Sequence, residues 1–169
     1  MNFLEVVKSR YSVRDFLERE VESDKLEYII ECARLAPSAC NRQPWQIHIV
    51  KRGEKFDALC ASAERFRWMK SAPMIIAVTV DDDAAWHRGA DNHNHSDIDA
   101  AIICEHIVLA AAEQSLGTCW ICAFNPEKAD LALGLKSPQR TVALLPLGYP
   151  KCEQSIRVRK SRGEIVIHE

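Results

Sequence analysis

Apolar residues recur at the spacing of an α-helix in five stretches of this chain, and each stretch predicts a helix. The stretch over residues 24–36 begins with Asp24, an N-cap residue followed by Glu27 three positions later, and Pro37 ends it. Another begins with the pair Asn125-Pro126 and ends before a glycine at position 134. The predicted helices span residues 2–9, 24–36, 54–67, 98–115 and 126–133.

Five shorter stretches predict β-strands, because their residues are β-branched or alternate between apolar and polar types. The continuous apolar run over residues 73–80 predicts a central strand, and the alternation over residues 164–168 predicts an edge strand. Residues 81–96 are polar, acidic and rich in histidine, which predicts a loop. The predicted strands span residues 45–50, 73–80, 118–124, 141–147 and 164–168.

The order of these elements predicts an α+β fold in which helices flank a mixed β-sheet. A length of 169 residues suits a single domain over residues 1–169. The helix over residues 98–115 is rich in alanine and apolar on most sides, so we expect it to be buried in a core or against a partner. Residues 151–169 are expected to form an extended C-terminal tail. Because this tail has too little core of its own to stay ordered, we expect it to pack against a second subunit.

Composition then narrows the class of protein. Apolar residues make up 47% of the chain and charged residues 27%, a balance typical of globular domains. A formal net charge of -2 argues against nucleic acid as a partner. No apolar run reaches the roughly 18 residues of a membrane-spanning helix. Seven cysteines without a secretory signal favour reduced thiols and a cytoplasmic location.

Two separated basic segments are candidates for binding one anionic ligand. Arg10 and Arg14 lie within residues 9–16 beside hydroxyl side chains, and guanidinium groups bind phosphate through paired hydrogen bonds. Five further cations fall within residues 151–162, whereas acidic residues cluster around residues 81–99. Both ends of the chain could therefore gather around an anion. The alternative is that each is a solvated basic stretch.

The segment from Ala36 to Trp45 is a candidate for binding a planar heterocycle. Prolines restrain its backbone near both ends. Between them Ser38, Asn41 and Gln43 offer hydroxyl and amide groups that can hydrogen-bond a carbonyl and imide edge. The alternative is an ordinary connection between a helix and a strand.

Two other patterns carry less chemistry. Cys119 and Cys122 have the spacing of a redox dithiol, but they fall in a predicted strand rather than at a helix N-terminus. His93, His95 and Asp97 could bind zinc or another divalent ion, and the alternative is a polar loop. The chain has no glycine-rich dinucleotide fingerprint, P-loop or nucleophile elbow, so a bound nucleotide would need another kind of phosphate site.

Four boxes in order resemble those of the FMN-dependent nitroreductase family. Residues 9–16, SRYSVRDF, resemble its N-terminal arginine box, and residues 36–45, APSACNRQPW, resemble its Ala-Pro-Ser-x-x-Asn-x-Gln-Pro-Trp box. Residues 109–124 match the long helix and the strand after it. Residues 147–150 and the pair Arg159-Lys160 match its C-terminal landmarks. The resemblance covers nearly the whole chain.

This resemblance implies an intertwined homodimer with FMN at the subunit interface. For the FMN phosphate it implies Arg10, Ser12 and either Arg159 or Lys160, and for the ribityl chain and ring it implies Tyr11 and Arg14. The remaining flavin contacts that it implies are Pro37, Ser38, Asn41 and Gln43 of the other subunit and the backbone of Ile121, Cys122 and Ala123.

The implied reaction passes a hydride from NADH or NADPH to FMN and then passes electrons to a nitroaromatic, a quinone or a similar small-molecule acceptor. The flavin carries the chemistry, so no catalytic dyad and no metal are expected. Two alternatives stay open: a flavin-binding protein without turnover, and a metal-dependent enzyme that uses His93, His95 and Asp97.

Overall fold

Six α-helices and four β-strands make up the regular structure of the computed structural model, which describes residues 1–154 and 157–169. The helices are α1 (Phe3–Ser9), α2 (Ser23–Arg34), α3 (Glu54–Ser62), α4 (Ser96–Glu113), α5 (Pro126–Leu133) and α6 (Arg162–Ile165). The strands are β1 (Trp45–Lys51), β2 (Met74–Asp81), β3 (Gly117–Thr118) and β4 (Gln139–Gly148). Two short 3-10 helices, η1 (Ala39–Asn41) and η2 (Arg67–Ser71), lie in the connections.

β2 is an inner strand of a four-stranded sheet with the order β1-β2-β4-β3. All of its residues except the last are buried, as its continuous apolar sequence predicts. Neighbouring strands are antiparallel, with Ile76 opposite both Ile49 of β1 and Leu145 of β4. The α+β class is confirmed. Among the described residues the parallel pairing is an isolated bridge between Ser12 and Thr118, so the sheet itself is antiparallel rather than mixed.

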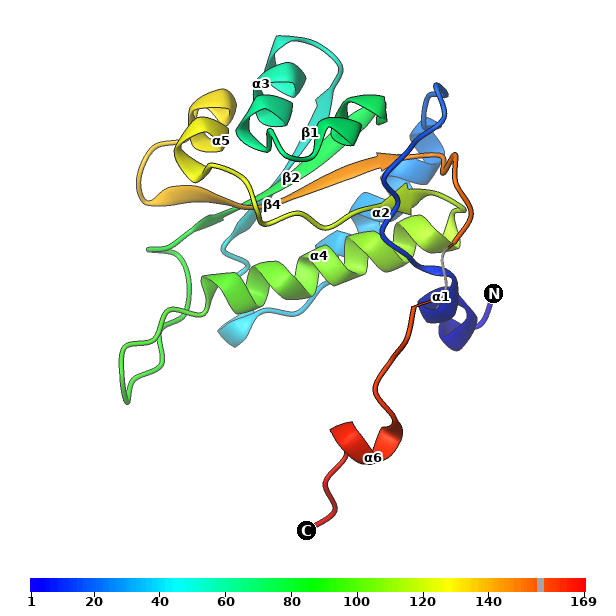
Figure 1. Ribbon diagram of the computed structural model, residues 1–169. Coiled ribbons are helices and arrows are strands. Elements are labelled where there is room, and N and C mark those ends of the chain that lie inside the picture. Colours follow the sequence, from blue (N-terminus) through cyan, green and yellow to red (C-terminus); the bar gives the residue numbers. More distant parts are fainter. Residues whose placement is uncertain (155–156) are drawn as a thin grey trace.

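The sheet separates two layers of helices. Alternate residues of a strand face opposite sides, so Ile76 and Val78 pack in a core with α2 and α4, and Ile75 and Ala77 pack in a second core with α3 and α5. Figure 1 shows α4 running along one face of the sheet, with α3 and α5 over the other. α4 is therefore a core element, as its alanine-rich sequence predicts.

Two helices differ from their predicted form at one end. Glu22 is the N-cap residue of α2 and makes no side-chain hydrogen bond there, so the predicted capping box of Asp24 and Glu27 is wrong. α3 ends at Ser62 instead of continuing to residue 67. Its last carbonyl accepts a hydrogen bond from the Asn125 N–H (2.8 Å), so a tertiary contact stands where helical bonding would continue.

Two predicted strands also differ. The strand expected over residues 118–124 shortens to β3 followed by an isolated bridge between Ile121 and Leu144. The edge strand expected over residues 164–168 is wrong, because Ser161 and Glu164 form a capping box that starts the short helix α6. The tail projects away from the sheet and its helices (Figure 1). In the part of the chain that the structure describes, no helix is long and apolar enough to cross a membrane.

Candidate functional site

The first basic segment is anchored to the sheet through β3. The Val13 N–H donates to the Thr118 carbonyl at 2.9 Å, and the Val13 side chain is completely buried. Gly117 makes this close approach possible, since a Cβ atom there would lie 2.5 Å from Cγ2 of Val13. Burial of Val13 fixes the backbone on which the neighbouring Ser12 and Arg14 stand.

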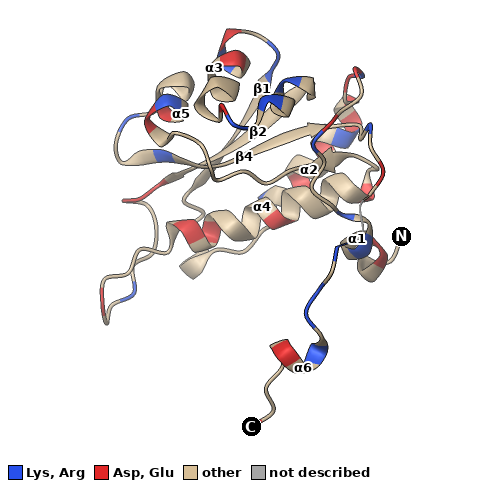
Figure 2. Cartoon of the chain, in the orientation of Figure 1, with Lys and Arg blue, Asp and Glu red and all other residues tan. Residues whose placement is uncertain are grey.

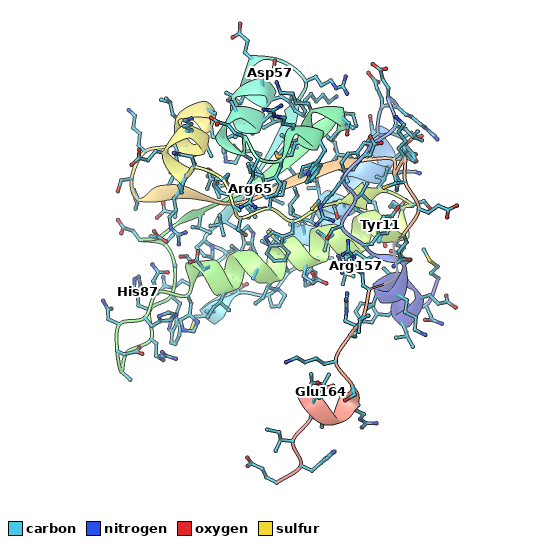
Figure 3. The ribbon with its side chains drawn as sticks, in the orientation of Figure 1. Tyr11, Asp57, Arg65, His87, Arg157 and Glu164 are labelled. Atoms are coloured by element: carbon cyan, nitrogen blue, oxygen red, sulfur yellow. The ribbon has the colours of Figure 1, made fainter. Side chains whose placement is uncertain are left out.

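The C-terminal arm, residues 149–154, returns beside this segment. The Leu17 N–H donates to the Tyr149 carbonyl at 2.9 Å, and the Lys151 N–H donates to the Asp15 carbonyl at 3.0 Å. Further along the arm, the Tyr11 hydroxyl donates to the backbone carbonyl of Cys152 at 2.6 Å. The arm thus brings the basic tail to the N-terminal segment, and Figure 3 shows Tyr11 and Arg157 at the same end of the molecule.

A cavity of about 660 Å³ lies where the two segments meet. Its lining combines cations with hydroxyl and amide groups, and no Asp or Glu belongs to that lining among the described residues. Figure 2 shows Lys and Arg on both the N-terminal segment and the tail. Such a cavity attracts an anion and offers it directed donors. The lining residues are Val7, Lys8, Arg10, Tyr11, Ser12, Arg14, Gln154, Arg157 and Arg159.

The structure thus brings together five of the predicted cofactor residues, Arg10, Tyr11, Ser12, Arg14 and Arg159. Lys160 is not part of the cavity lining.

Four lining residues were not among the predicted contacts: Val7, Lys8, Gln154 and Arg157. The sequence gives a partial signal for two of them: Arg157 belongs to the basic tail, and Lys8 directly precedes the arginine box. Gln154 reaches the cavity because its side-chain amide donates to the Lys8 carbonyl at 2.9 Å, a contact between residues far apart in the chain.

The loop Ser38–Gln43 has a restrained and unusual backbone. Cys40, Asn41 and Gln43 all have positive φ angles, of 48°, 53° and 50°. The left-handed conformation costs a non-glycine residue about 1–2 kcal/mol. Internal hydrogen bonds close the loop; among them, the Gln43 N–H donates to Ser38 Oγ at 2.8 Å, and Gln43 Nε2 donates to Asn41 Oδ1 at 3.1 Å.

The loop is also tied to the helix layer. The Ala39 N–H donates to Oδ1 of Asp99, in the first turn of α4, at 2.9 Å. Pro37, Asn41 and Gln43 are exposed, and Ser38 is half-buried. The loop therefore presents amide groups to its surroundings from a fixed backbone.

The segment after β3 carries the remaining predicted contacts. Ile121 is buried and exchanges two backbone hydrogen bonds of 3.0 Å with Leu144. Cys122 and Ala123, which follow it, are exposed. This segment is thus held against the sheet at Ile121, and the Cys122 carbonyl accepts from the Phe124 N–H at 3.1 Å.

The loop Ser38–Gln43 and the basic cavity lie near opposite ends of α4. Ala39 contacts Asp99 in the first turn, whereas Arg10 and Tyr11 lie beside Ala112 near the last turn. An α-helix rises 1.5 Å per residue, which separates these two places by about 20 Å. Within one chain, the loop is therefore not adjacent to the basic cavity.

The cysteine pair does not resemble a reactive dithiol. Cys119 is buried and Cys122 is exposed, and both are free thiols. Burial raises the pKa of the Cys119 thiol, while the charge of Arg14 and other nearby groups acts in the opposite direction. A raised pKa is the reverse of what a nucleophilic thiolate needs.

The histidine-rich loop shows no arrangement of metal ligands. Within residues 1–154 and 157–169, no group of three or more His, Cys, Asp or Glu side chains could hold a metal ion. Asp97 instead pairs with Arg140 at 2.8 Å, and the His95 ring packs edge-on against Trp86 with 4.6 Å between centroids. The metal-dependent alternative therefore finds no support in this geometry.

Comparison with known proteins extends over the whole chain. The sequence model described as the nitroreductase family matches residues 7–65 and 54–149. A nitroreductase family protein of Clostridium difficile 630 has a crystal structure that is similar with a TM-score of 0.93 and 33% sequence identity, covering 100% of this chain and 99% of that one.

Two more distant proteins are also similar to this chain. An NADH dehydrogenase of Thermus thermophilus is 28% identical over 83% of this chain and 83% of its own length. A Desulfovibrio desulfuricans protein whose structure was solved in complex with FMN has a TM-score of 0.86 at 24% identity, covering 100% of this chain and 97% of that one.

The shared architecture and the sequence match define an α+β oxidoreductase. Because the family match covers more than half of the sequence, this chain belongs to the nitroreductase family.

Proposed function

We propose that this chain is an FMN-dependent oxidoreductase and that the basic cavity holds the FMN phosphate. One observation carries the proposal: Arg10, Ser12 and Arg159, from opposite ends of the sequence, line the same cavity. A phosphate monoester is a dianion with three acceptor oxygens, which guanidinium forks and a serine hydroxyl match. Lys8, Arg14 and Arg157 add to the positive charge there, so the residues present fit the group.

The rest of the cofactor extends from that cavity along the N-terminal segment. Tyr11 and Arg14 line the same cavity, which supports their proposed contact with the ribityl chain. Cys122 and Ala123 are exposed residues, and their backbone N–H groups would face the ring, with Ile121 bonded to Leu144 just before them. Lys160 stays a prediction as an additional phosphate contact.

A second copy of the chain is proposed to complete each site. Pro37, Ser38, Asn41 and Gln43 lie about 20 Å along α4 from the basic cavity of their own chain, and in the proposed homodimer they contact the flavin in the partner's cavity. Apolar surface supports this homodimer. A cavity of about 590 Å³ beside α4 is lined partly by Phe3, Val6, Ile102 and Leu109, and Phe3 is 72% exposed.

Bound FMN would supply two-electron chemistry between NADH or NADPH and a small-molecule acceptor such as a nitroaromatic or a quinone. The chain's own part is to bind the cofactor through the cavity cations, to orient the ring through residues 121–123, and to stabilise added negative charge on the ring through nearby N–H groups and cations. The NADH dehydrogenase of Thermus thermophilus and the FMN complex from Desulfovibrio desulfuricans support this assignment.

A spectroscopic titration tests the proposal. Purified protein, reconstituted with FMN and freed of excess, is expected to show bound-flavin absorbance that bleaches under anaerobic addition of NADH or NADPH. Re-oxidation by a quinone or a nitroaromatic should restore the spectrum over repeated cycles. Protein that stays colourless after reconstitution would overturn FMN binding.

The same titration separates turnover from simple flavin binding. A storage or sensing protein would bind FMN but would show no steady oxidation of NADH or NADPH in the presence of the acceptor. Sustained oxidation would exclude that alternative.

A further inference from the structure

We propose that Asp99 is a positioning residue that fixes the loop Ser38–Gln43 in the shape that presents Asn41 and Gln43 to the flavin. The proposal rests on the proposed function, because that function assigns this loop to the cofactor. Asp99 itself lies in the first turn of α4, and its side chain accepts a hydrogen bond from the loop backbone at Ala39.

Asp99 is a buried carboxylate with a single side-chain hydrogen bond in the described structure. The residue is 1% exposed, its Oδ1 accepts from the Ala39 N–H at 2.9 Å, and its Oδ2 has no partner there. A carboxyl group buried in this way is costly unless its bonds compensate. Ser96, the buried polar residue one turn earlier in α4, bonds to Asp82, and the buried Ala100 and Ile103 are apolar, so none of the three provides a partner for Asp99. The hydrogen bond from the Ala39 N–H is therefore the contact that we assign to the Asp99 carboxylate.

The turn that carries Asp99 is fixed to the sheet. Ser96 Oγ donates to Oδ1 of Asp82 at 2.7 Å, and Arg140 donates to both oxygens of Asp82 at 2.8 and 3.1 Å. Asp82 directly follows β2 and Arg140 belongs to β4, so the first turn of α4 is clamped to two strands. Arg140 also pairs with Asp97 of the same turn at 2.8 Å. The hydrogen bond from Ala39 to Asp99 therefore attaches the loop to a helical turn that is itself fixed to the sheet.

The loop needs this attachment because three of its residues adopt the left-handed backbone conformation, which non-glycine residues rarely adopt. Cys40, Asn41 and Gln43 have positive φ angles, and the bonds between Ser38, Asn41 and Gln43 close the loop on itself without attaching it to a helix. The Ala39–Asp99 bond provides that attachment. When it is lost, the three residues are free to return to negative φ, and the amide groups of Asn41 and Gln43 turn to new directions.

Three variants of the full-length protein test this role. Asp99→Ala removes the acceptor, whereas Asp99→Asn retains an amide oxygen that can accept from Ala39. Asp130→Ala is the matched control, because Oδ1 of Asp130 accepts from the Thr141 N–H at 2.7 Å, which is the same kind of bond in another part of the fold. Two quantities are measured: the rate of tryptic cleavage after Arg42 in the FMN-free protein, and the Kd for FMN.

Asp99→Ala should be cleaved after Arg42 several times faster than the wild type. Its Kd for FMN should rise by about tenfold or more, the effect of losing a hydrogen bond to a charged group. Asp99→Asn should restore both quantities to within a few-fold of wild type, a rescue that follows the acceptor atom. Asp130→Ala should lower global stability and leave both quantities near wild type. Equal effects of Asp99→Ala and Asp130→Ala, or unchanged cleavage in Asp99→Ala, would overturn the proposal.

One further measurement keeps the outcome decisive. Amide hydrogen exchange of the wild type should show protection of the Ala39 N–H although the loop is at the surface, and rapid exchange there would overturn the proposal even if Asp99→Ala fails to fold. If the wild type binds no FMN, the proposed function fails, while cleavage and exchange still report whether Asp99 holds the loop.

Discussion

Arg10 and Arg162 carry the same charge in very different surroundings. Arg10 lines the basic cavity, whereas Arg162 is exposed in α6 at the far end of the tail. Arg10→Ala is expected to weaken FMN binding by about 10- to 100-fold, since hydrogen bonds to charged groups contribute roughly 1.5–3 kcal/mol. Arg162→Ala should change the Kd by less than twofold. Fluorescence titration of FMN-free protein measures both, and equal losses would remove the proposed role of Arg10.

The pair of Glu22 and Tyr149 makes part of the stability depend on pH. The Tyr149 hydroxyl donates to the Glu22 carboxylate at 2.5 Å, and this bond is the main reason why the pKa of Glu22 is lowered to about 2 from its ordinary value of 4.5. A lowered pKa in the folded state means that the stabilisation is complete above pH 4.5 and is lost as the pH falls toward 2.

Glu22→Gln should therefore flatten the decline in unfolding free energy over that acidic range. Urea denaturation at several pH values measures this slope. Glu20→Gln changes an exposed glutamate outside the pair and should keep the wild-type slope. A wild-type slope in Glu22→Gln would show that the bond to Tyr149 does not contribute to acid stability.

At the scale of elements, β3 and the N-terminal segment depend on the absence of a side chain at Gly117. A methyl group there would lie 2.5 Å from Val13 Cγ2 and 3.0 Å from its Cβ, both on a stiff β-branched side chain. Gly117→Ala should therefore destabilise the fold by about 1–3 kcal/mol. It should also weaken FMN binding, because the displaced segment carries Ser12 and Arg14.

Gly89→Ala is the control, since a Cβ at Gly89 meets no atom within 4 Å. Denaturant unfolding of both variants measures the difference. A Gly117→Ala protein as stable as Gly89→Ala would mean that the segment moves aside without cost.

Local patterns predicted most elements because their causes are local. α5 begins and ends where the sequence indicates, with Asn125 accepting from the Lys128 N–H and Gly134 in the left-handed conformation. The edge strand over residues 164–168 was wrong for a local reason too: the alternation of isoleucines competes with a capping box at Ser161 and Glu164, and no strand lies beside the tail in the described structure to favour pairing.

The site was predicted where its residues form boxes and missed where contacts are distant. Arg10, Ser12 and Arg14 are close in sequence and stand in one cavity. Gln154 reaches that cavity through a contact with Lys8, 146 positions away, and no periodicity encodes such a pairing. The hydrogen bond between Ala39 and Asp99 joins residues 60 positions apart. The apolar pattern of the helix that contains Asp99 predicts burial of that helix but not this bond.

At the scale of the whole molecule, the tail exposes apolar side chains that one chain does not cover. Val158 is 92% exposed and Ile167 is 86% exposed. If these side chains pack on a second copy in the proposed homodimer, deletion of residues 157–169 should shift the protein toward the monomer. It should also reduce FMN retention, because Arg157 and Arg159 are lost from the cavity.

Sedimentation velocity measures that shift, with the full-length chain at the same concentration as the control. A full-length protein that sediments as a monomer would contradict the homodimer, and a truncated dimer would show that the tail is dispensable for association. The cytoplasmic location and the single domain over residues 1–169 stay predictions of the sequence.

Because the basic cavity and the loop Ser38–Gln43 are separated along α4, two different variants of the proposed homodimer should complement each other. An Arg10→Ala chain keeps a sound loop, and an Asn41→Ala chain keeps a sound cavity. Mixed by unfolding and refolding together, the two weakly binding chains form heterodimers in which one site collects both defects and the other collects neither. With equal chains and random pairing, roughly a quarter of all sites should regain wild-type FMN affinity. A site built within one chain would allow no such complementation.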